Sequence, residues 1–155
     1  MTAGTVFMTS MATEHNGRLS PPAAAALTPV RKIFRCFVST VVPEATNLDD
    51  RAWDEVESLV EGTLQNRPAS MQRQLRLLLR AIQCLPIFRF GRPFTALDAS
   101  HRSRMLSYLQ DHRLELIRNG FWGLRTLAFA GYYGRPEAAR AIGYAADPRG
   151  WEALQ

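Results

Sequence analysis

The chain has 155 residues, of which 46% are hydrophobic and 21% are charged, and its formal net charge is +5. These values are ordinary for a globular protein, so they argue against global disorder, and the length favours one domain. Of the 19 basic residues, only Lys32 is a lysine. Such a skew is more simply the codon bias of a GC-rich genome than a surface selected to bind phosphate.

The charges are unevenly distributed along the chain. Residues 44–61 hold seven acids and one base, whereas residues 67–118 hold ten bases and three acids. The two segments can therefore satisfy each other's charges, although exposed ion pairs contribute only about 0–1 kcal/mol each.

The N-terminal residues 1–19 lack periodic apolar residues, which predicts a disordered tail, and residues 20–155 form the predicted helical domain. A first helix is expected to begin at Thr28 as N-cap, with Pro29 in the first turn, and to stop at Pro43. Its apolar face comprises Ile33, Phe34, Phe37, Val38 and Val41.

Three more amphipathic helices are predicted to follow. One begins at Asp49 and Asp50, one begins at the cap Ser70 and ends at Pro86, and one begins at Asp98 and runs to about Gln110. Helical spacing turns these residues inward: Trp53, Val56, Leu59 and Val60; Leu75, Leu78, Leu79, Ile82 and Leu85; and Met105, Leu106 and Leu109.

A loop is expected over residues 86–97, which contain two prolines and one glycine. This loop is unusually apolar because it carries Phe88, Phe90 and Phe94 around Arg92. Three phenylalanines in a loop must be buried, either in the core of this chain or against a partner.

The last long helix, up to about Tyr133, is apolar around most of its circumference, so it is expected at the centre of a bundle or against a partner. One face carries Leu114, Ile117, Phe121, Leu124 and Ala128, which should be core. A neighbouring stripe carries Arg118, Trp122, Arg125, Phe129 and Tyr132 or Tyr133. Arginine alternating with aromatic residues is typical of protein–protein interfaces, although aromatic stripes at helical spacing are also often core.

These elements predict an all-α fold, a single compact bundle of about five helices with a central apolar C-terminal helix. No strand-like alternation and no internal repeat is present. No apolar run is long enough to span a membrane, and no secretory or twin-arginine signal is recognisable, so we expect a cytoplasmic protein.

Catalytic and cofactor motifs are lacking. His101 and His112 are not at the i, i+4 spacing of a helical metal pair, and no glycine-rich phosphate loop occurs. Cys36 and Cys84 lie in apolar periodic runs, which predicts reduced, buried thiols. We therefore expect no catalysis from this chain alone, and no cofactor or metal bound by it.

The order of several short motifs resembles the gluconate 2-dehydrogenase subunit 3 family. The matching positions are Leu27-Thr28-Pro29, Val41-Val42-Pro43, Phe94-x-x-Leu97, Arg102-x-x-x-Leu106, Arg118, Tyr132-Tyr133 and Ile142-Gly143-Tyr144. Members of this family are small helical subunits that accompany FAD-dependent oxidoreductases of the glucose–methanol–choline type. The same order is similar to the N-terminal helical extension of long-chain fatty alcohol oxidases.

The resemblance implies a noncatalytic small subunit that binds and stabilises a larger FAD-dependent alcohol, sugar or sterol-type dehydrogenase or oxidase, and that can wall its substrate entrance. FAD is expected in the partner subunit, not in this chain. The predicted partner-binding residues are Phe88, Phe90, Arg92, Phe94, Arg118, Trp122, Arg125, Phe129, Tyr133 and Tyr144.

Two alternative functions stay open. The stripe Arg73, Arg76 and Arg80 suits a basic helical nucleic-acid-binding module, but no helix-turn-helix spacing supports it, so no nucleic-acid partner is expected. A peripheral membrane or scaffold protein would instead use the long last helix and the phenylalanine-rich loop.

Overall fold

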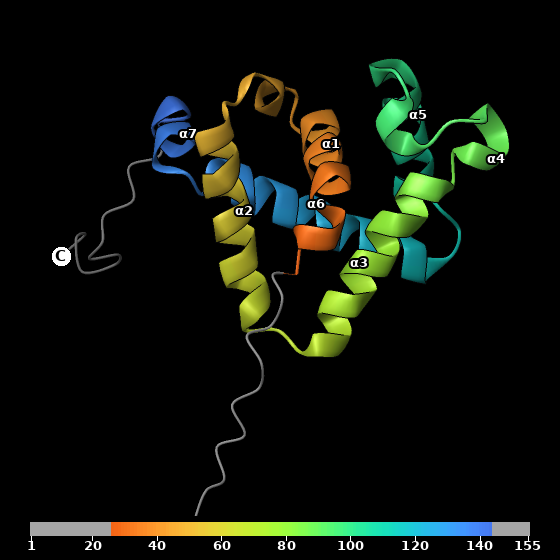
Figure 1. Cartoon of the computed structure of the whole chain (residues 1–155), viewed down its shortest axis with the longest axis horizontal. Helices are drawn as coiled ribbons and strands as arrows, with labels where there is room; N and C mark the ends of the chain where they lie inside the picture. The colour runs from red at the N-terminus through yellow and green to blue at the C-terminus, as the bar shows by residue number, and fades with distance from the viewer. Residues whose placement is uncertain (1–25, 144–155) are drawn as a thin grey trace, which may run out of the picture.

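Helices account for all of the regular structure in the computed structural model, which describes residues 26–143 (Figure 1). The α-helices are α1 (Arg31–Val41), α2 (Asp50–Gln65), α3 (Ala69–Cys84), α4 (Ile87–Phe90), α5 (Ala99–Gln110), α6 (Glu115–Tyr133) and α7 (Pro136–Ala141). Three short 3-10 helices accompany them: η1 (Thr28–Val30), η2 (Pro43–Asn47) and η3 (Phe94–Ala96). The predicted tail 1–19 and the residue Tyr144 lie outside the described residues.

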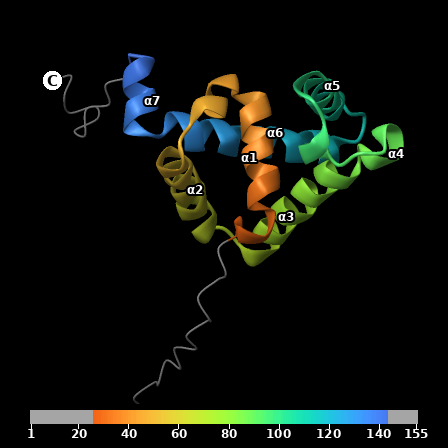
Figure 2. The same cartoon turned by 45° about the horizontal axis from the view of Figure 1, so that its top comes forward.

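The five long helices form one bundle, as predicted. Helices α2 and α3 form the two arms of a V, with α1 between them, while α6 crosses behind all three (Figures 1 and 2). Helix α6 packs against α1, α2, α3, α5 and α7, which confirms its central position. One face of α6 nevertheless stays uncovered, since Leu116 is 84% exposed and Trp122 is 44% exposed.

The core is built around α1, whose Phe34, Phe37 and Val38 are fully buried. The ring of Phe37 meets that of Phe121 on α6 edge to face, with centroids 5.9 Å apart. Each buried phenylalanine contributes about 1.5–3 kcal/mol relative to an exposed one, so the α1–α6 crossing is a major source of stability.

Two of the predicted helix caps are confirmed. Asp49 accepts a hydrogen bond from the backbone N–H of Ala52, and Asp98 accepts one from that of His101. The predicted caps Thr28 and Ser70 are wrong.

Different residues hold those two N-cap positions. Leu27 precedes η1, and Pro68 precedes α3. The carbonyl of Pro68 accepts hydrogen bonds from the N–H groups of Met71 and Gln72, so α3 begins before Ser70 can cap it.

The predicted loop over 86–97 contains two helical segments, α4 and η3. Pro86 fixes a helical φ of −68° just before α4, and Gly91 ends α4 in the left-handed region at φ +66°. At the end of α6, by contrast, Gly134 keeps a helical φ of −70°, and the chain turns at the extended Arg135.

Four residues predicted to be buried are exposed: Leu59, Leu85, Leu114 and Cys84. Leu114 and Leu85 flank α6 and α3 rather than lying within them, so the apolar face of the helix no longer directs their side chains inward. Cys36 is half-buried. The prediction of buried thiols therefore fails for Cys84.

Candidate functional site

The uncovered face of α6 carries a preformed arrangement of arginine and aromatic rings. The guanidinium carbon of Arg125 lies 5.1 Å from the ring centroid of Trp122 and 5.3 Å from that of Phe129. Its Nη1 donates to Oε1 of Gln110 on α5 at 3.2 Å. Arg125 is therefore fixed by two rings and one hydrogen bond, while Trp122 remains 44% exposed.

The stripe continues toward the end of α6 as a row of rings. Phe129 and Tyr133 stack with centroids 6.0 Å apart, and Tyr133 meets Tyr132 edge to face at 5.0 Å. Phe129 and Tyr132 also pack against the core, so this part of the stripe is half internal. The alternative of core aromatics therefore holds in part, for Phe129 and Tyr132, while the interface stays a prediction.

Arg135, which the sequence did not indicate as part of this site, packs at the end of this row of rings. Arg135 is 3% exposed, and its guanidinium carbon lies 4.9 Å from the ring centroid of Tyr132. Its Nε also donates to the backbone oxygen of Tyr132 at 3.3 Å. An arginine at the break before Pro136 gives no sign in the sequence that it folds back onto the helix.

Arg118, at the other end of the stripe, is half-buried and lies near the α5–α6 connection. Its Nη1 donates to the backbone oxygen of His112 at 3.5 Å, a long hydrogen bond. Arg118 therefore supports the turn into α6 and still lies on the predicted stripe.

The phenylalanine-rich segment does not act as one surface. Phe88 on α4 is 93% exposed, and Arg92 is exposed as well. Phe90 is half-buried, with its ring 5.0 Å from that of His101. Phe94 is fully buried in the core, so its prediction as a contact residue is wrong.

The motif around Phe94 has a structural role. Gln83 on α3 and Thr95 on η3 exchange two hydrogen bonds, of 2.9 and 3.3 Å. Arg102 on α5 donates from Nη2 to the backbone oxygen of Thr95 at 3.0 Å. These bonds hold η3 between α3 and α5 and direct Phe94 into the core.

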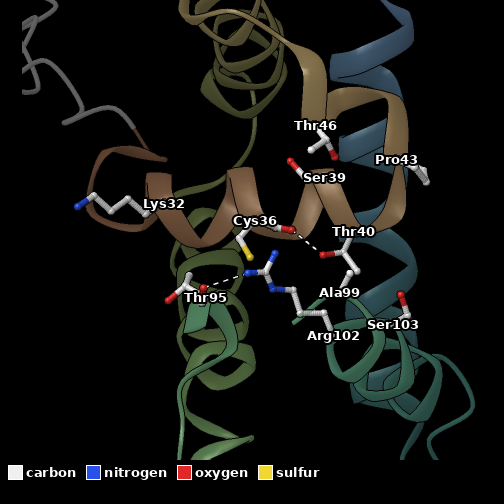
Figure 3. Close-up of a pocket in the computed structure, with 10 residues that line it drawn as sticks. All are labelled: Lys32, Cys36, Ser39, Thr40, Pro43, Thr46, Thr95, Ala99, Arg102 and Ser103. Carbon is white, nitrogen blue, oxygen red and sulfur yellow. Dashed lines mark hydrogen bonds between the residues drawn. The ribbon is translucent and has the colours of Figure 1, made fainter. Parts of the chain in front are cut away.

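A hollow of about 570 Å³ lies between α1, η2, η3 and α5 (Figure 3). Arg102 lies at its centre, beneath Cys36, while the side chain of Lys32 points away from both. Burial raises the pKa of the Cys36 thiol, although the charge of Arg102 opposes the shift. A protonated thiol is a poor nucleophile, so burial disfavours nucleophilic attack by Cys36. Its lining comprises Lys32, Cys36, Ser39, Thr40, Pro43, Thr46, Thr95, Ala99, Arg102 and Ser103.

The acidic segment pairs with α1 instead of with the basic segment. Glu57 on α2 accepts from Nε of Arg31 at 2.6 Å and from Nε of Arg35 at 2.5 Å. The hydrogen bond to Glu57 raises the pKa of Arg31 above its ordinary value. The expected pairing between the segments 44–61 and 67–118 is therefore wrong, because α1 lies between α2 and α3 and carries its own arginines (Figure 2).

Across residues 26–143, no three histidine, cysteine, aspartate or glutamate side chains gather where they could hold a metal ion. Within the same range, no helix has the length and apolar character needed to cross a bilayer. No family model, no curated protein and no solved structure matches this chain.

Proposed function

We propose that this chain is a noncatalytic helical subunit that binds a larger protein through the uncovered face of α6. The observation that carries the proposal is Arg125, held between the rings of Trp122 and Phe129 with Trp122 still partly in solvent. Arginine and tryptophan are the residue types most enriched among those that dominate binding energy.

The arrangement is suited to binding because much of its ordering is complete before a partner arrives. A free arginine side chain loses about 0.5–1.5 kcal/mol of conformational entropy when an interface immobilises it. The hydrogen bond from Arg125 to Gln110 reduces that loss, since it already restrains the guanidinium. Gly123 and Thr126 on the same face are small and exposed, so a partner can approach the α6 backbone beside Trp122.

The partner class follows from the family that the chain resembles. We propose a large FAD-containing oxidoreductase of the glucose–methanol–choline type, which acts on CH–OH groups and holds the FAD itself. This chain would stabilise that subunit and border its substrate entrance.

The proposal is tested by affinity purification of the tagged full chain from its native host, followed by a visible spectrum of the eluate. A larger protein that co-elutes with flavin absorption is the expected result. A larger partner without flavin would retain the subunit role and refute the FAD assignment. A chain that elutes alone would refute both.

The surface is tested with Trp122→Ala, measured against the purified partner. We expect a loss of about 2 kcal/mol of binding energy, roughly thirtyfold in Kd. The matched control is Tyr108→Ala, because Tyr108 is an exposed aromatic residue on α5, outside the stripe. Equal losses for both variants, or none for Trp122→Ala, would exclude the α6 face as the site.

A further inference from the structure

The surface of α3 and α4 carries an excess of positive charge. Residues 62–97 contain no aspartate or glutamate, yet they contain Arg67, Arg73, Arg76, Arg80, Arg89 and Arg92. None of these six arginines forms an ion pair with the residues that the structure describes. The nearest acidic helix, α2, directs Asp54 and Glu57 to the arginines of α1 instead.

Exposed apolar side chains lie among these arginines. On α3, Arg73, Leu77 and Arg80 have the i, i+4, i+7 spacing of one helix face, and all three are exposed. At the end of α3 and on α4, Leu85, Ile87 and Phe88 are exposed, and Phe88 is almost entirely in solvent at 93%. A phenylalanine that protrudes this far contributes nothing to the described core.

We infer that the α3–α4 surface docks onto an anionic lipid bilayer. The arginines would lie at the level of the anionic headgroups, and Phe88 with Ile87 would enter the acyl boundary. Both features are required for such binding: electrostatic attraction to the headgroups and apolar area inserted below them.

This combination fits a bilayer better than other polyanions. A nucleic-acid backbone would engage the arginines but would leave Leu77, Leu85 and Ile87 without a partner. An acidic protein would need an apolar pocket shaped to receive Phe88, whereas a bilayer accepts a protruding ring without a matching cavity. The inference is also independent of the proposed function, because it uses α3 and α4 and not the stripe on α6.

The test is co-sedimentation of the full chain with vesicles of phosphatidylcholine, with and without phosphatidylglycerol. We expect binding to the phosphatidylglycerol vesicles that weakens as salt is raised, and little binding to phosphatidylcholine alone. Absence of binding to anionic vesicles at low salt would overturn the inference.

Variants distinguish this surface from general basic character. Each of Arg80→Gln and Arg89→Gln is expected to weaken vesicle binding about fivefold, and Phe88→Ser roughly tenfold. The matched controls are Arg51→Gln on α2 for charge and Ile142→Ser after α7 for an exposed apolar side chain. If the control variants weaken vesicle binding as much as the α3–α4 variants do, the inference is overturned.

Two further results separate the alternatives. Tighter binding to poly(U) RNA or to polyglutamate than to anionic vesicles would assign the surface to that polyanion and refute the bilayer. Trp122→Ala should leave vesicle binding unchanged. Partner binding therefore tests the α6 face, and vesicle binding tests the α3–α4 surface independently.

Discussion

Gly131 on α6 and Val60 on α2 approach so closely that a Cβ atom on Gly131 would lie 2.8 Å from a methyl carbon of Val60. The same Cβ would lie 3.1 Å from a methyl carbon of Val56. Gly131→Ala is therefore expected to lower the free energy of unfolding by about 1–3 kcal/mol, because the two helices must separate. Urea unfolding followed by circular dichroism measures this loss.

Gly123 supplies the control for that substitution. A Cβ there meets no atom within 4 Å, so Gly123→Ala should raise stability by about 0.5–1 kcal/mol through helix propensity. Equal effects of the two alanines would show that α2 and α6 are not in close contact at Gly131.

Truncation of Phe94 should lower the stability of the protein much more than truncation of Phe88. Phe94→Ala leaves a cavity in the core and is expected to lower the free energy of unfolding by about 3–5 kcal/mol. Phe88→Ala should change it by no more than about 0.5 kcal/mol, because Phe88 is exposed. Chemical denaturation of both variants tests the pair, and a mild effect of Phe94→Ala would place its ring outside the core.

Glu57, a buried carboxylate on α2, forms ion pairs with both Arg31 and Arg35 of α1. Glu57→Gln is expected to lower the free energy of unfolding by about 1.5–3 kcal/mol, the usual range for hydrogen bonds to charged groups. Glu55→Gln removes an exposed pair with Arg51 on the same helix and should cost at most about 0.5 kcal/mol. If both variants unfold at the same urea concentration, Glu57 has no special structural role.

Asp98 predicts a specific acid sensitivity. The hydrogen bond from the backbone N–H of His101, followed by those from the side chains of Ser100 and His101, holds its pKa well below the ordinary value of 3.8. The folded state therefore binds fewer protons than the unfolded chain. The stability that Asp98 contributes is present above its unfolded pKa of 3.8 and is lost as the pH falls from there through its lower folded pKa. Asp98→Asn keeps a capping side chain but removes this titration.

The Tm of the wild type should exceed that of Asp98→Asn at neutral pH, and the difference should shrink as the pH falls below about 3.8. Thermal melts of both proteins between neutral and acidic pH measure it. A difference in Tm that stays constant through this range would rule out Asp98 as the titrating group.

Local patterns predicted much of this fold. The spacing of Phe34, Phe37 and Val38 identified the buried face of α1, and the aspartates before α2 and α5 identified two helix starts. Apolar spacing and helix capping both depend on residues within about one turn of each other, so both can be recognised from the sequence alone.

The errors arose where distant segments compete. Phe94 was expected at a partner surface, but the bonds of Thr95 to Gln83 and Arg102 direct it into the core. The acids of α2 pair with α1 because the bundle places α1 beside them. Neither outcome depends on neighbours in the sequence, so periodicity and composition contain no signal for it.

Helix α6 packs against α1, α2, α3, α5 and α7, yet it is the last long helix of the bundle along the chain. During synthesis, α1 therefore leaves the ribosome before any residue of the helix that will cover Phe37. Until α6 emerges, α1 can pack only against earlier elements such as α3 and α5, and Phe37 lacks its contact with Phe121. A chain truncated before Glu115 would therefore leave the sides of α1 and α2 that face α6 permanently uncovered.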